Sequence, residues 1–573
     1  MTRKEVLESL RDRPEVSVLI AGGGINGAGL LRELALQGVD ALLVDKSDFC
    51  AGASAASTRI IHGGLRYLEN GEFRLVREAL RERNRLLENA AHYVRPLPTT
   101  IPIFSWTSGL FSAAGKFLGL SEQPSDRGAL LIGIGLSLYD LFTGRQSVLP
   151  AHQFKSRQWS LNLRPELNPE IVCTALYYDA SISYPERLCL ELIQDAEALS
   201  PDVRGLNYVS VYGASRHAVV LKDELSGELV SVQPRIVVNA TGAWIDFTNR
   251  ALQRTTDYIG GTKGSHVVID HPGLLAATRG QMLYFANADG RICIFYPYYG
   301  RVIAGSTDIP VRDPEASCDE AEVDYILASL RLVFPSIEVN RSHIVFRFCG
   351  VRPLPRSNAA TPGQISRDHI CAVLPAGGDT DFPVYSLIGG KWTTFRAFGE
   401  QVADKILAAL GRRRIASSVH LPIGGGKGYP RSESETDAWL DAVQEKTGLP
   451  RARLVTLLDR YGTRAEGVAL FIAMGADSPL RHQPEYSRRE IMYLASQERI
   501  VHLDDLILRR TILALLGQVN GALLEELAGI IAPVLNWTPQ QASGEVQRTA
   551  QILKERHGLS AEQLARAHSP KAC

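Results

Sequence analysis

The sequence has no excess of charge of either sign. Its 573 residues carry 62 Lys and Arg against 62 Asp and Glu, so the formal net charge at pH 7 is zero. A neutral chain has no global field to attract nucleic acid or an acidic membrane. We therefore expect no nucleic-acid partner, and any anion site must be a local cluster of basic residues.

Cysteine is sparse, and its spacing is irregular. The eight cysteines include no C-x-x-C pair and no Cys/His spacing typical of a metal centre. The pattern argues against a zinc site, an iron–sulfur cluster or a disulfide framework, and favours reduced thiols in the cytosol. No metal ligand is predicted.

Long hydrophobic runs are also lacking. The N-terminal stretch MTRKEVLESLRDRPEV carries Glu5, Glu8 and Asp12 and has no apolar core, so it fits neither a secretory signal nor a transit peptide. The most apolar region, Pro96 to Phe142, contains ALLIGIGLSLYDLF, which is too short and too rich in glycine to span a bilayer. Two buried helices are the favoured interpretation of this region, and an amphipathic surface in the membrane interface is the alternative.

Length and composition predict a soluble globular enzyme of two or three domains, since the chain is 45% hydrophobic and 22% charged. Glycine and proline concentrate in LPIGGGKGYPRSES, residues 421–434, which we interpret as a flexible linker. Residues 1–420 precede it. Helical apolar spacing, as in Leu503 to Leu516, predicts an all-α domain over residues 435–573, where nothing indicates catalysis.

The most informative stretch is VSVLIAGGGINGAGLLRELALQGVDALLVD, from Val16 to Asp45. It predicts a strand, a glycine turn and a helix, then a second strand that ends on an acidic residue suited to a ribose hydroxyl. Gly22 permits the tight turn, Gly24 lets the backbone approach a pyrophosphate, and Gly27 lets the helix pack on the strand. The expected ligand is a dinucleotide, and the motif alone does not separate NAD from FAD.

The sheet that begins here is resumed late in the chain. RIVVNATGAW contains a buried strand that runs into Asn239-Ala240-Thr241-Gly242, and such a return suits a flavoprotein with an inserted domain. GTKGSHVVID, QMLYFANADGRICIFYPYYG and RVIAGSTD have the pattern of antiparallel strands. We predict an α/β protein whose Rossmann-like FAD-binding domain carries an antiparallel substrate domain, at about residues 95–170 and 250–350.

Two further groups of residues point to chemistry. His62-Gly63-Gly64-Leu65-Arg66-Tyr67 places a base and a cation beside paired glycines, ahead of a helix predicted from Phe73 to Ala90 whose arginines read as a solvated face. Arg352, Arg367 and Lys391 lie among glycine, proline and strand ends, and with Arg66 they supply enough positive charge for a phosphate. Gly389-Gly390-Lys391 lacks the spacing of a P-loop.

With these residues in view, the chain resembles the FAD-dependent glycerol-3-phosphate dehydrogenases of the aerobic type. The motifs that carry the resemblance are GGGINGAG, SAASTRIIHGGLRYLE, KGSHVVI, IAGSTD, GVRPL, ISRD, GGKWTTFR and HLDDLILRRT. Departures are small: Asp45 stands where many members carry Glu, and Trp392 lies inside the lysine motif. The resemblance implies noncovalent FAD, oxidation of sn-glycerol 3-phosphate to dihydroxyacetone phosphate, and electron transfer to a membrane quinone.

The chemistry requires a base, a cation for the substrate oxygen and a phosphate clamp. We expect His62 to be the base, although it could instead only contact the flavin, and His266 is the reserve. By resemblance, Arg352 polarises the C2 oxygen, while Arg66, Tyr67, Arg367 and Lys391 hold the substrate or its phosphate, with Thr307 as a further candidate. The expected FAD contacts are Gly22, Gly24, Ile25, Asn26, Gly27, Asp45, Lys46, Ser54, Ser57, Thr58, His62, Gly63, Gly64, Leu65, Ala240, Thr241, Gly242, Gly389, Gly390, Lys391, Trp392 and Thr393.

Three other functions stay open at this point: a glycerol-3-phosphate oxidase that uses oxygen, an amino-acid oxidase of similar fold, and a flavin-containing binding protein without turnover. The expected location is the cytoplasm, with peripheral attachment to the inner face of the cell membrane. A homodimer is a candidate assembly that the sequence leaves open.

Overall fold

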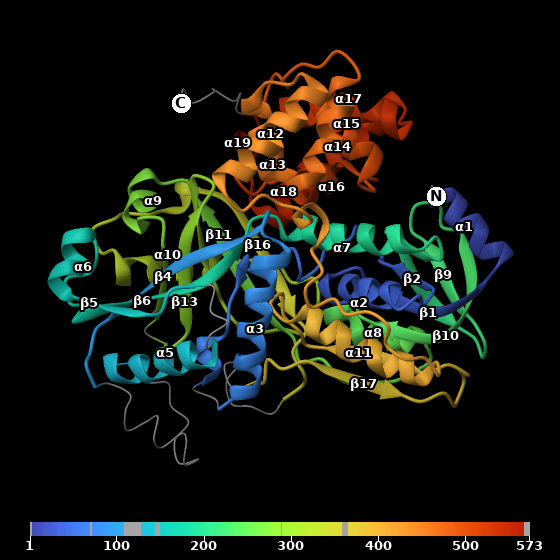
Figure 1. Ribbon diagram of the computed structural model, residues 1–573, viewed down its shortest axis with the longest axis horizontal. Helices are drawn as coiled ribbons and strands as arrows, with labels where there is room; N and C mark the ends of the chain where they lie inside the picture. The colour runs from blue at the N-terminus through green and yellow to red at the C-terminus, as the bar shows by residue number, and fades with distance from the viewer. Residues whose placement is uncertain are drawn as a thin grey trace.

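The computed structural model describes residues 3–68, 71–107, 128–143, 149–287, 289–357 and 365–565 (Figure 1). Within these ranges the chain forms two β-sheets flanked by helices, and the helices from α12 onward gather to one side of both sheets. The predicted α/β class with an inserted sheet and a helical C-terminal part is confirmed.

The first sheet has the strand order β17-β18-β10-β1-β2-β7, with the β8–β9 hairpin joined to β10. Neighbouring strands from β18 to β7 run parallel. Their central residues are apolar and buried, as in β2 and in the second half of β10, whereas the first half of β10 alternates between exposed and buried positions. The strands are β1 (Glu15–Ala21), β2 (Ala41–Val44), β7 (Val203–Leu206), β8 (Val209–Ala214), β9 (Val219–Asp223), β10 (Leu229–Asn239), β17 (Ile370–Leu374) and β18 (Val384–Ile388).

Helices cover this first sheet. Leucines at helical spacing in α2 pack between the sheet and the helices α7 and α11, which both contact α2. The helices are α1 (Arg3–Asp12), α2 (Ile25–Leu36), α7 (Pro185–Leu199), α8 (Ile245–Ala251) and α11 (Phe395–Ala409), with the short turn η3 (Gly242–Trp244) before α8. The glycine turn between β1 and α2 therefore lies at the carboxyl edge of the sheet, where dinucleotides bind in this class of fold.

The second sheet is mainly antiparallel, with the order β15-β11-β14-β13-β12-β4-β6-β3, and β16 and β5 pair with β11 and β6. Only the contact of β4 with β12 is parallel among its described pairs. The strands are β3 (Ile60–Ile61), β4 (Val94–Ile103), β5 (Gln153–Ser156), β6 (Cys173–Ile182), β11 (Thr262–Ile269), β12 (Met282–Ala286), β13 (Ile292–Tyr298), β14 (Arg301–Gly305), β15 (Ile309–Pro310) and β16 (Ile344–Arg352). Helices α6 (Arg157–Leu163), α9 (Pro272–Thr278) and α10 (Glu320–Val333) and the turn η4 (Arg341–His343) flank it.

The predicted insert ended too early. Strand β6 pairs with β4 along its whole length, from Val94 opposite Ile182 to Ile103 opposite Cys173, so the second sheet extends past residue 170. Strand β3, directly before His62, also belongs to this sheet. The turn that contains His62 is therefore positioned by the second sheet as well as by the first.

Helix α3 (Phe73–Asn89) follows the turn η1 (Leu65–Leu68) and confirms the predicted helix. Its arginines do not all face solvent, however. The side chain of Arg83 is 2% exposed and forms an ion pair with Asp179 on β6, so the prediction of a solvated arginine face was wrong at this position.

Only part of the apolar region Pro96 to Phe142 can be compared with the predicted pair of buried helices, because most of the first predicted run lies outside the described residues. Its first part belongs to β4, residues 108–127 lie outside the described ranges, and α5 (Ala129–Thr143) follows. Leu136 and Tyr139 are buried in α5, whereas Leu130, Ile134 and Leu141 on the same helix are more than half exposed. Among the described residues, no helix is long and apolar enough to cross a membrane.

The C-terminal part is helical. Its elements are η6 (Gly424–Gly426), α12 (Glu433–Thr447), α13 (Arg451–Tyr461), η7 (Gly462–Arg464), α14 (Ala465–Ala473), α15 (Arg488–Gln497), α16 (Leu503–Asp505), η8 (Leu506–Arg510), α17 (Gly521–Leu535), α18 (Pro539–His557) and α19 (Ala561–Ala565). The predicted helix Leu503 to Leu516 is instead a short helix, a π-helical turn at η8 and irregular backbone.

The glycine-rich linker is not a loose tether. Gly425 and Gly426 are buried, and the Gly424 and Gly425 N–H groups donate to Asp195 and Glu191 on α7. A Cβ atom at Gly425 would lie 2.2 Å from the carbonyl oxygen of Tyr461. Glycine is present because two backbones approach closely, and the prediction of a flexible connector was wrong for this reason.

Candidate active site

The glycine turn is built as the sequence predicts. Gly22 has a φ of +107°, and a Cβ atom there would lie 2.5 Å from the Ala240 carbonyl oxygen. A Cβ atom at Gly27 would lie 1.9 Å from the Gly22 carbonyl oxygen, so α2 packs against the turn only because that side chain is missing. Gly24 is the N-cap of α2 and supplies no capping side chain. The Ile25 N–H donates to the Ser54 hydroxyl at 3.0 Å.

Asp45 lies at the end of β2, beside this turn. Its carboxylate accepts the Gly23 N–H at 2.7 Å and the Ser47 N–H at 2.9 Å. Burial raises the pKa of Asp45 to about 6, against the hydrogen bonds from Ser47 and Gly23, which lower it. A further hydroxyl donor would favour the charged carboxylate, which is the interaction expected of a ribose.

A cavity of about 1010 Å³ joins the turn to most of the other predicted residues. From the predicted cofactor and substrate residues it is lined by Gly22, Gly24, Ile25, Asn26, Asp45, Lys46, Ser54, Ser57, Thr58, His62, Gly64, Leu65, Tyr67, Ala240, Thr241, Gly242, His266, Arg352, Arg367, Gly389, Gly390, Lys391, Trp392 and Thr393. Residues from both sheets and from the C-terminal part therefore surround one space.

Four predicted residues are not among the lining residues. Gly27 serves the packing of α2, and the Gly63 N–H donates to the Asp179 carboxylate and the Tyr139 hydroxyl, each at 3.0 Å. Thr307 is 1% exposed; its hydroxyl donates to Glu322 at 2.6 Å and accepts the Ser265 N–H at 2.9 Å, so we no longer assign it to the substrate. The side chain of Arg66 lies outside the described part of the chain.

His62, the predicted base, lies at the wall of the cavity. Its carbonyl oxygen accepts the Thr393 hydroxyl at 3.1 Å, which fixes the turn, while its side chain lines the cavity. Burial, Lys391 and Arg367 lower the pKa of His62 to about 4, although Asp179 opposes the shift. The imidazole is therefore neutral at physiological pH and can accept a proton.

Lys391 is a buried cation above an aromatic ring. Its ammonium lies 3.8 Å from the centroid of the Tyr67 ring, and no described residue offers it a hydrogen-bond acceptor with good geometry. Burial lowers the pKa of Lys391, and the attraction of Tyr67 and Glu72 compensates only in part. An unpaired buried ammonium is a ready site for an anion.

Arg352 and Arg367 converge on one carboxylate. Arg352 donates to Asp308 at 3.1 Å and Arg367 donates to its other oxygen at 2.8 Å. Asp308 was missed in the sequence analysis, although it is the last residue of the IAGSTD motif, directly after Thr307. The shared carboxylate holds two guanidinium groups side by side and limits their mutual repulsion.

His266 fits the reserve base less well. Its ring stacks on Phe348, with centroids 4.9 Å apart and planes at 9°, and its Nε2 lies 3.0 Å from the Thr58 hydroxyl. Burial and Arg352 lower the pKa of His266 to about 3. Its Nδ1 has no hydrogen-bond partner among the described residues.

A buried polar cluster around Asp179 holds the backbone of the turn that follows His62. Asp179 on β6 accepts hydrogen bonds from Gly63 and from Arg83 on α3 at 3.0 and 3.2 Å, and Tyr139 on α5 donates to the same oxygen. The sequence analysis missed this cluster because its other members lie 40, 96 and 116 positions from Asp179 and form no local motif with it.

Comparisons with known proteins agree with this geometry. Residues 17–404 match the family model described as FAD dependent oxidoreductase, and residues 416–542 match the C-terminal domain of alpha-glycerophosphate oxidase. A glycerol-3-phosphate dehydrogenase from Synechocystis sp. is 33% identical to this chain over 580 aligned residues, covering 95% of this chain and 98% of its own. The chain belongs to the FAD-dependent glycerol-3-phosphate dehydrogenase family.

Solved structures support the fold. The X-ray structure of the glycerol-3-phosphate dehydrogenase from Bacillus halodurans complexed with FAD superposes with a TM-score of 0.72 at 21% identity, over 96% of this chain and 97% of that one. The L-alpha-glycerophosphate oxidase from Mycoplasma pneumoniae, with FAD bound, matches 71% of this chain and 99% of its own, with a TM-score of 0.51 at 19% identity.

FAD is the cofactor of this family member, and the residues present fit it. The glycine turn leaves space for a pyrophosphate, and Asp45 can accept a hydroxyl. Two buried polar atoms that line the same cavity, Asn26 Oδ1 and Lys391 Nζ, have no hydrogen-bond partner among the described residues. Among those residues there is also no group of three potential ligands that could hold a metal ion.

Proposed function

We propose that this dehydrogenase oxidises sn-glycerol 3-phosphate to dihydroxyacetone phosphate and passes the electrons to a membrane quinone. The main support for this substrate is one cavity that contains both the dinucleotide turn and a set of candidate catalytic residues. These residues are Arg352, Arg367, Lys391 and the neutral His62. The 33% identical relative named as a glycerol-3-phosphate dehydrogenase supports the same substrate.

Charge favours a phosphorylated substrate. Asp308 neutralises one of the two arginines that it bridges, so these side chains and Lys391 together carry a net charge of about two positive units. A phosphate monoester carries about −1.5 to −2 at pH 7. An amino acid would instead present one carboxylate and an ammonium group, and it would leave one buried cation uncompensated.

FAD, when bound, accepts a hydride from the substrate carbon. The protein must remove the hydroxyl proton and stabilise the charge that develops on the oxygen. We assign proton removal to the neutral imidazole of His62 and stabilisation of the C2 oxygen to Arg352. Arg367, Lys391 and the ring of Tyr67 then hold the phosphate, and Arg66 stays a predicted contact.

The test is anaerobic reduction of the yellow protein by candidate substrates. Glycerol 3-phosphate should bleach the flavin absorbance, whereas glycerol at equal concentration should bleach it far more slowly, because it cannot use the cations. Equal rates with the two compounds would contradict the phosphate clamp. No bleaching by either would favour a binding protein over an enzyme.

The electron acceptor needs its own experiment. Reduced enzyme should be reoxidised faster by a soluble quinone analogue than by dissolved oxygen. The alternative acceptor, oxygen, is favoured by the likeness to the protein named L-alpha-glycerophosphate oxidase, a likeness that by itself concerns the fold. Faster reoxidation by oxygen, with stoichiometric peroxide, would establish that alternative.

A quinone acceptor requires contact with the bilayer. We propose that the exposed apolar side chains of Leu130, Ile134 and Leu141 on α5, together with Trp106 beyond β4, lie in the membrane interface at the inner face of the cell membrane. The enzyme would then be cytoplasmic and peripherally bound. A homodimer stays a prediction, to be tested by size-exclusion chromatography with light scattering.

A further inference from the structure

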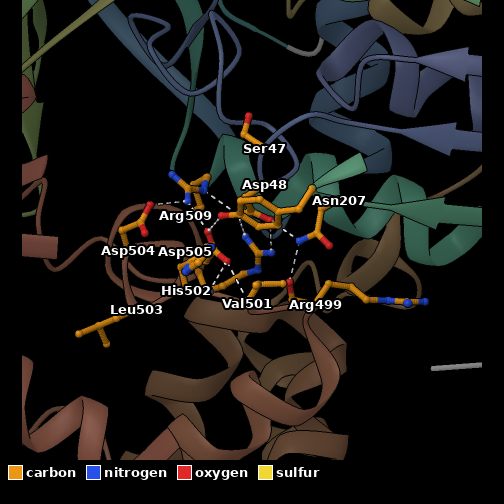
Figure 2. A network of polar contacts seen from close by, with 12 residues as sticks. Ser47, Asp48, Asn207, Arg499, Val501, His502, Leu503, Asp504, Asp505 and Arg509 are labelled. Atoms are coloured by element: carbon orange, nitrogen blue, oxygen red, sulfur yellow. Dashed lines mark hydrogen bonds and ion pairs between the residues drawn. The ribbon is translucent and has the colours of Figure 1, made fainter. Parts of the chain in front are cut away.

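Three residues after Asp45, the predicted ribose contact, lies the fully buried carboxylate of Asp48. Asp48 accepts hydrogen bonds from Arg509 at 2.6 Å and from Asn207 at 3.1 Å (Figure 2). It also accepts two hydrogen bonds from Arg510, at 2.7 and 2.8 Å. Burial by itself would raise the pKa of Asp48, but Arg510 and Arg509 outweigh it and lower the pKa to about 2. The carboxylate is charged and fully satisfied.

Both arginines come from the C-terminal part of the chain, more than 450 positions away. They are the last residues of the π-helical turn η8, and both guanidinium groups reach the same carboxylate. In a regular α-helix neighbouring side chains diverge by about 100°, and π-helical turns are frequent at functional sites. Here the two successive arginines at the end of the turn reach one carboxylate, Asp48.

A second carboxylate extends the network toward the cofactor cavity. Asp505 accepts a hydrogen bond from Arg509 (Figure 2). It also accepts the hydroxyl of Tyr208 at 2.7 Å. The Tyr208 N–H in turn donates to the Ser47 carbonyl at 2.9 Å, and the next N–H, of Val209, donates to the Asp45 carbonyl at 2.7 Å. The segment Asp45–Asp48 is thus held between the β7–β8 turn and η8.

The C-terminal part also forms a wall of the cavity. Arg509, Arg548 and Arg556 line it together with Asp45 and Lys46. Lys46 and Arg556 both bind Glu315, each at 3.1 Å, which links α18 to the residue directly after Asp45. Arg510 does not line the cavity, and its contact with Asp48 connects it to the segment that does.

We propose that the C-terminal helical part is a component of the FAD site, in which Arg509 and Arg510, by binding Asp48, fix the Asp45-Lys46-Ser47 segment in the conformation that receives the adenosine half of FAD. Removing one arginine leaves a buried charge incompletely compensated, and the segment that carries Asp45 must move to relieve it. Arg510 is a positioning residue. By linkage, bound FAD stabilises the contact between η8 and Asp48 by the same free energy.

The first test measures FAD binding to full-length apoprotein. Arg510→Met should raise the Kd for FAD at least tenfold, and Arg510→Lys should restore part of the affinity because it keeps the charge. The matched control is Arg460→Met, which also removes one of two arginines from a buried carboxylate, Glu490, but within the C-terminal helices and outside the cavity lining. Each Kd is read from a flavin titration at a temperature where circular dichroism shows the variant folded.

Equal FAD affinity in the Arg510→Met and Arg460→Met variants would overturn the proposal, because the network would then serve only stability. A second measurement needs no variant. The Val501 and His502 N–H groups both donate to Asp505, the residue directly before η8, at 2.9 Å, so their hydrogen exchange reports on the α16–η8 segment. Saturating FAD should slow exchange in residues 501–511 and leave residues 453–461 unchanged. Unchanged exchange in residues 501–511 would equally refute the coupling.

Discussion

Lys391 is buried without a hydrogen-bonded partner, so its charge should cost stability in the free enzyme and return it when substrate binds. The environment already disfavours the ammonium: burial lowers the pKa of Lys391 although Tyr67 and Glu72 attract the cation. A cation–π contact is worth roughly 0.5–2 kcal/mol, while taking an unpaired ion out of water costs several kcal/mol. We therefore expect Lys391→Met, which removes the charge and keeps most of the length of the side chain, to raise the Tm of the substrate-free enzyme.

The same substitution should damage catalysis. A charge-assisted hydrogen bond to a phosphate is worth roughly 1.5–3 kcal/mol, so kcat/KM for glycerol 3-phosphate should fall about 10- to 150-fold. The weak activity on glycerol should hardly change, because that substrate has no phosphate. The assay is the ratio of kcat/KM for the two substrates in each variant, together with the Tm of the same samples without substrate.

The Lys391→Met substitution should raise Tm and lower kcat/KM, and these opposite changes distinguish a binding role from a structural one. A residue with a purely structural role would lose stability and activity together. A lower Tm in the Lys391→Met variant would show that the ammonium has a partner in the free enzyme. An unchanged ratio of efficiencies would move Lys391 from the substrate phosphate to the flavin.

Other consequences of the geometry can be measured directly. Because the pKa of His62 is lowered to about 4, kcat/KM should fall on the acid side near pH 4 and not near 6.5, and His62→Gln should lower turnover of both substrates with FAD retained. Below about pH 6.5 the unfolded chain binds a proton at His62 that the folded protein binds only near pH 4, so the free energy of unfolding of the wild type should fall as the pH drops from 6.5 to 4. The His62→Gln variant should keep part of that free energy. An equal fall in the two proteins across this pH range would contradict a buried neutral imidazole. Gly24→Val should yield colourless protein, since an added side chain starts 3.1 Å from the Ser54 hydroxyl and projects into the cavity; full flavin content would refute the assignment of this turn. Leu141→Glu, at a side chain that is 71% exposed, should release the enzyme from vesicles at unchanged Tm, whereas unfolding would show that α5 is part of the core.

The nucleotide turn could be predicted from sequence because its physics is local. The positions of Gly22, Gly27 and Asp45 are fixed by a strand, a turn, a helix and a second strand that are consecutive in the chain. The division into an α/β part and a helical C-terminal part could also be predicted, because the two parts differ in the period of their apolar residues. The prediction that the first part of the inserted domain ends near residue 170 was wrong for the opposite reason. The pairing of β6 with β4 joins strands about 80 positions apart, which no local pattern reveals.

Partners of charged residues could not be predicted in this way. Arg83, Arg352 and Arg367 all looked like surface or substrate cations, yet each has a carboxylate partner on a different element. Sequence spacing gives the face on which a side chain lies but not the charge that meets it after folding. Among the predicted cations whose side chains are described, Lys391 alone has no hydrogen-bonded partner, and it keeps the anion-binding character that its motif suggests.

The C-terminal part illustrates the consequence for function. Its helices have the spacing of a separate bundle, and on that basis nothing in it indicates catalysis. Folding, however, brings two of its arginines to a carboxylate three residues after Asp45. A buried charge pair of this kind adds little net stability compared with apolar packing, but losing one partner is costly. Such a contact therefore penalises every arrangement in which the two parts separate, and the Asp45 segment keeps its shape only while the C-terminal helices are docked.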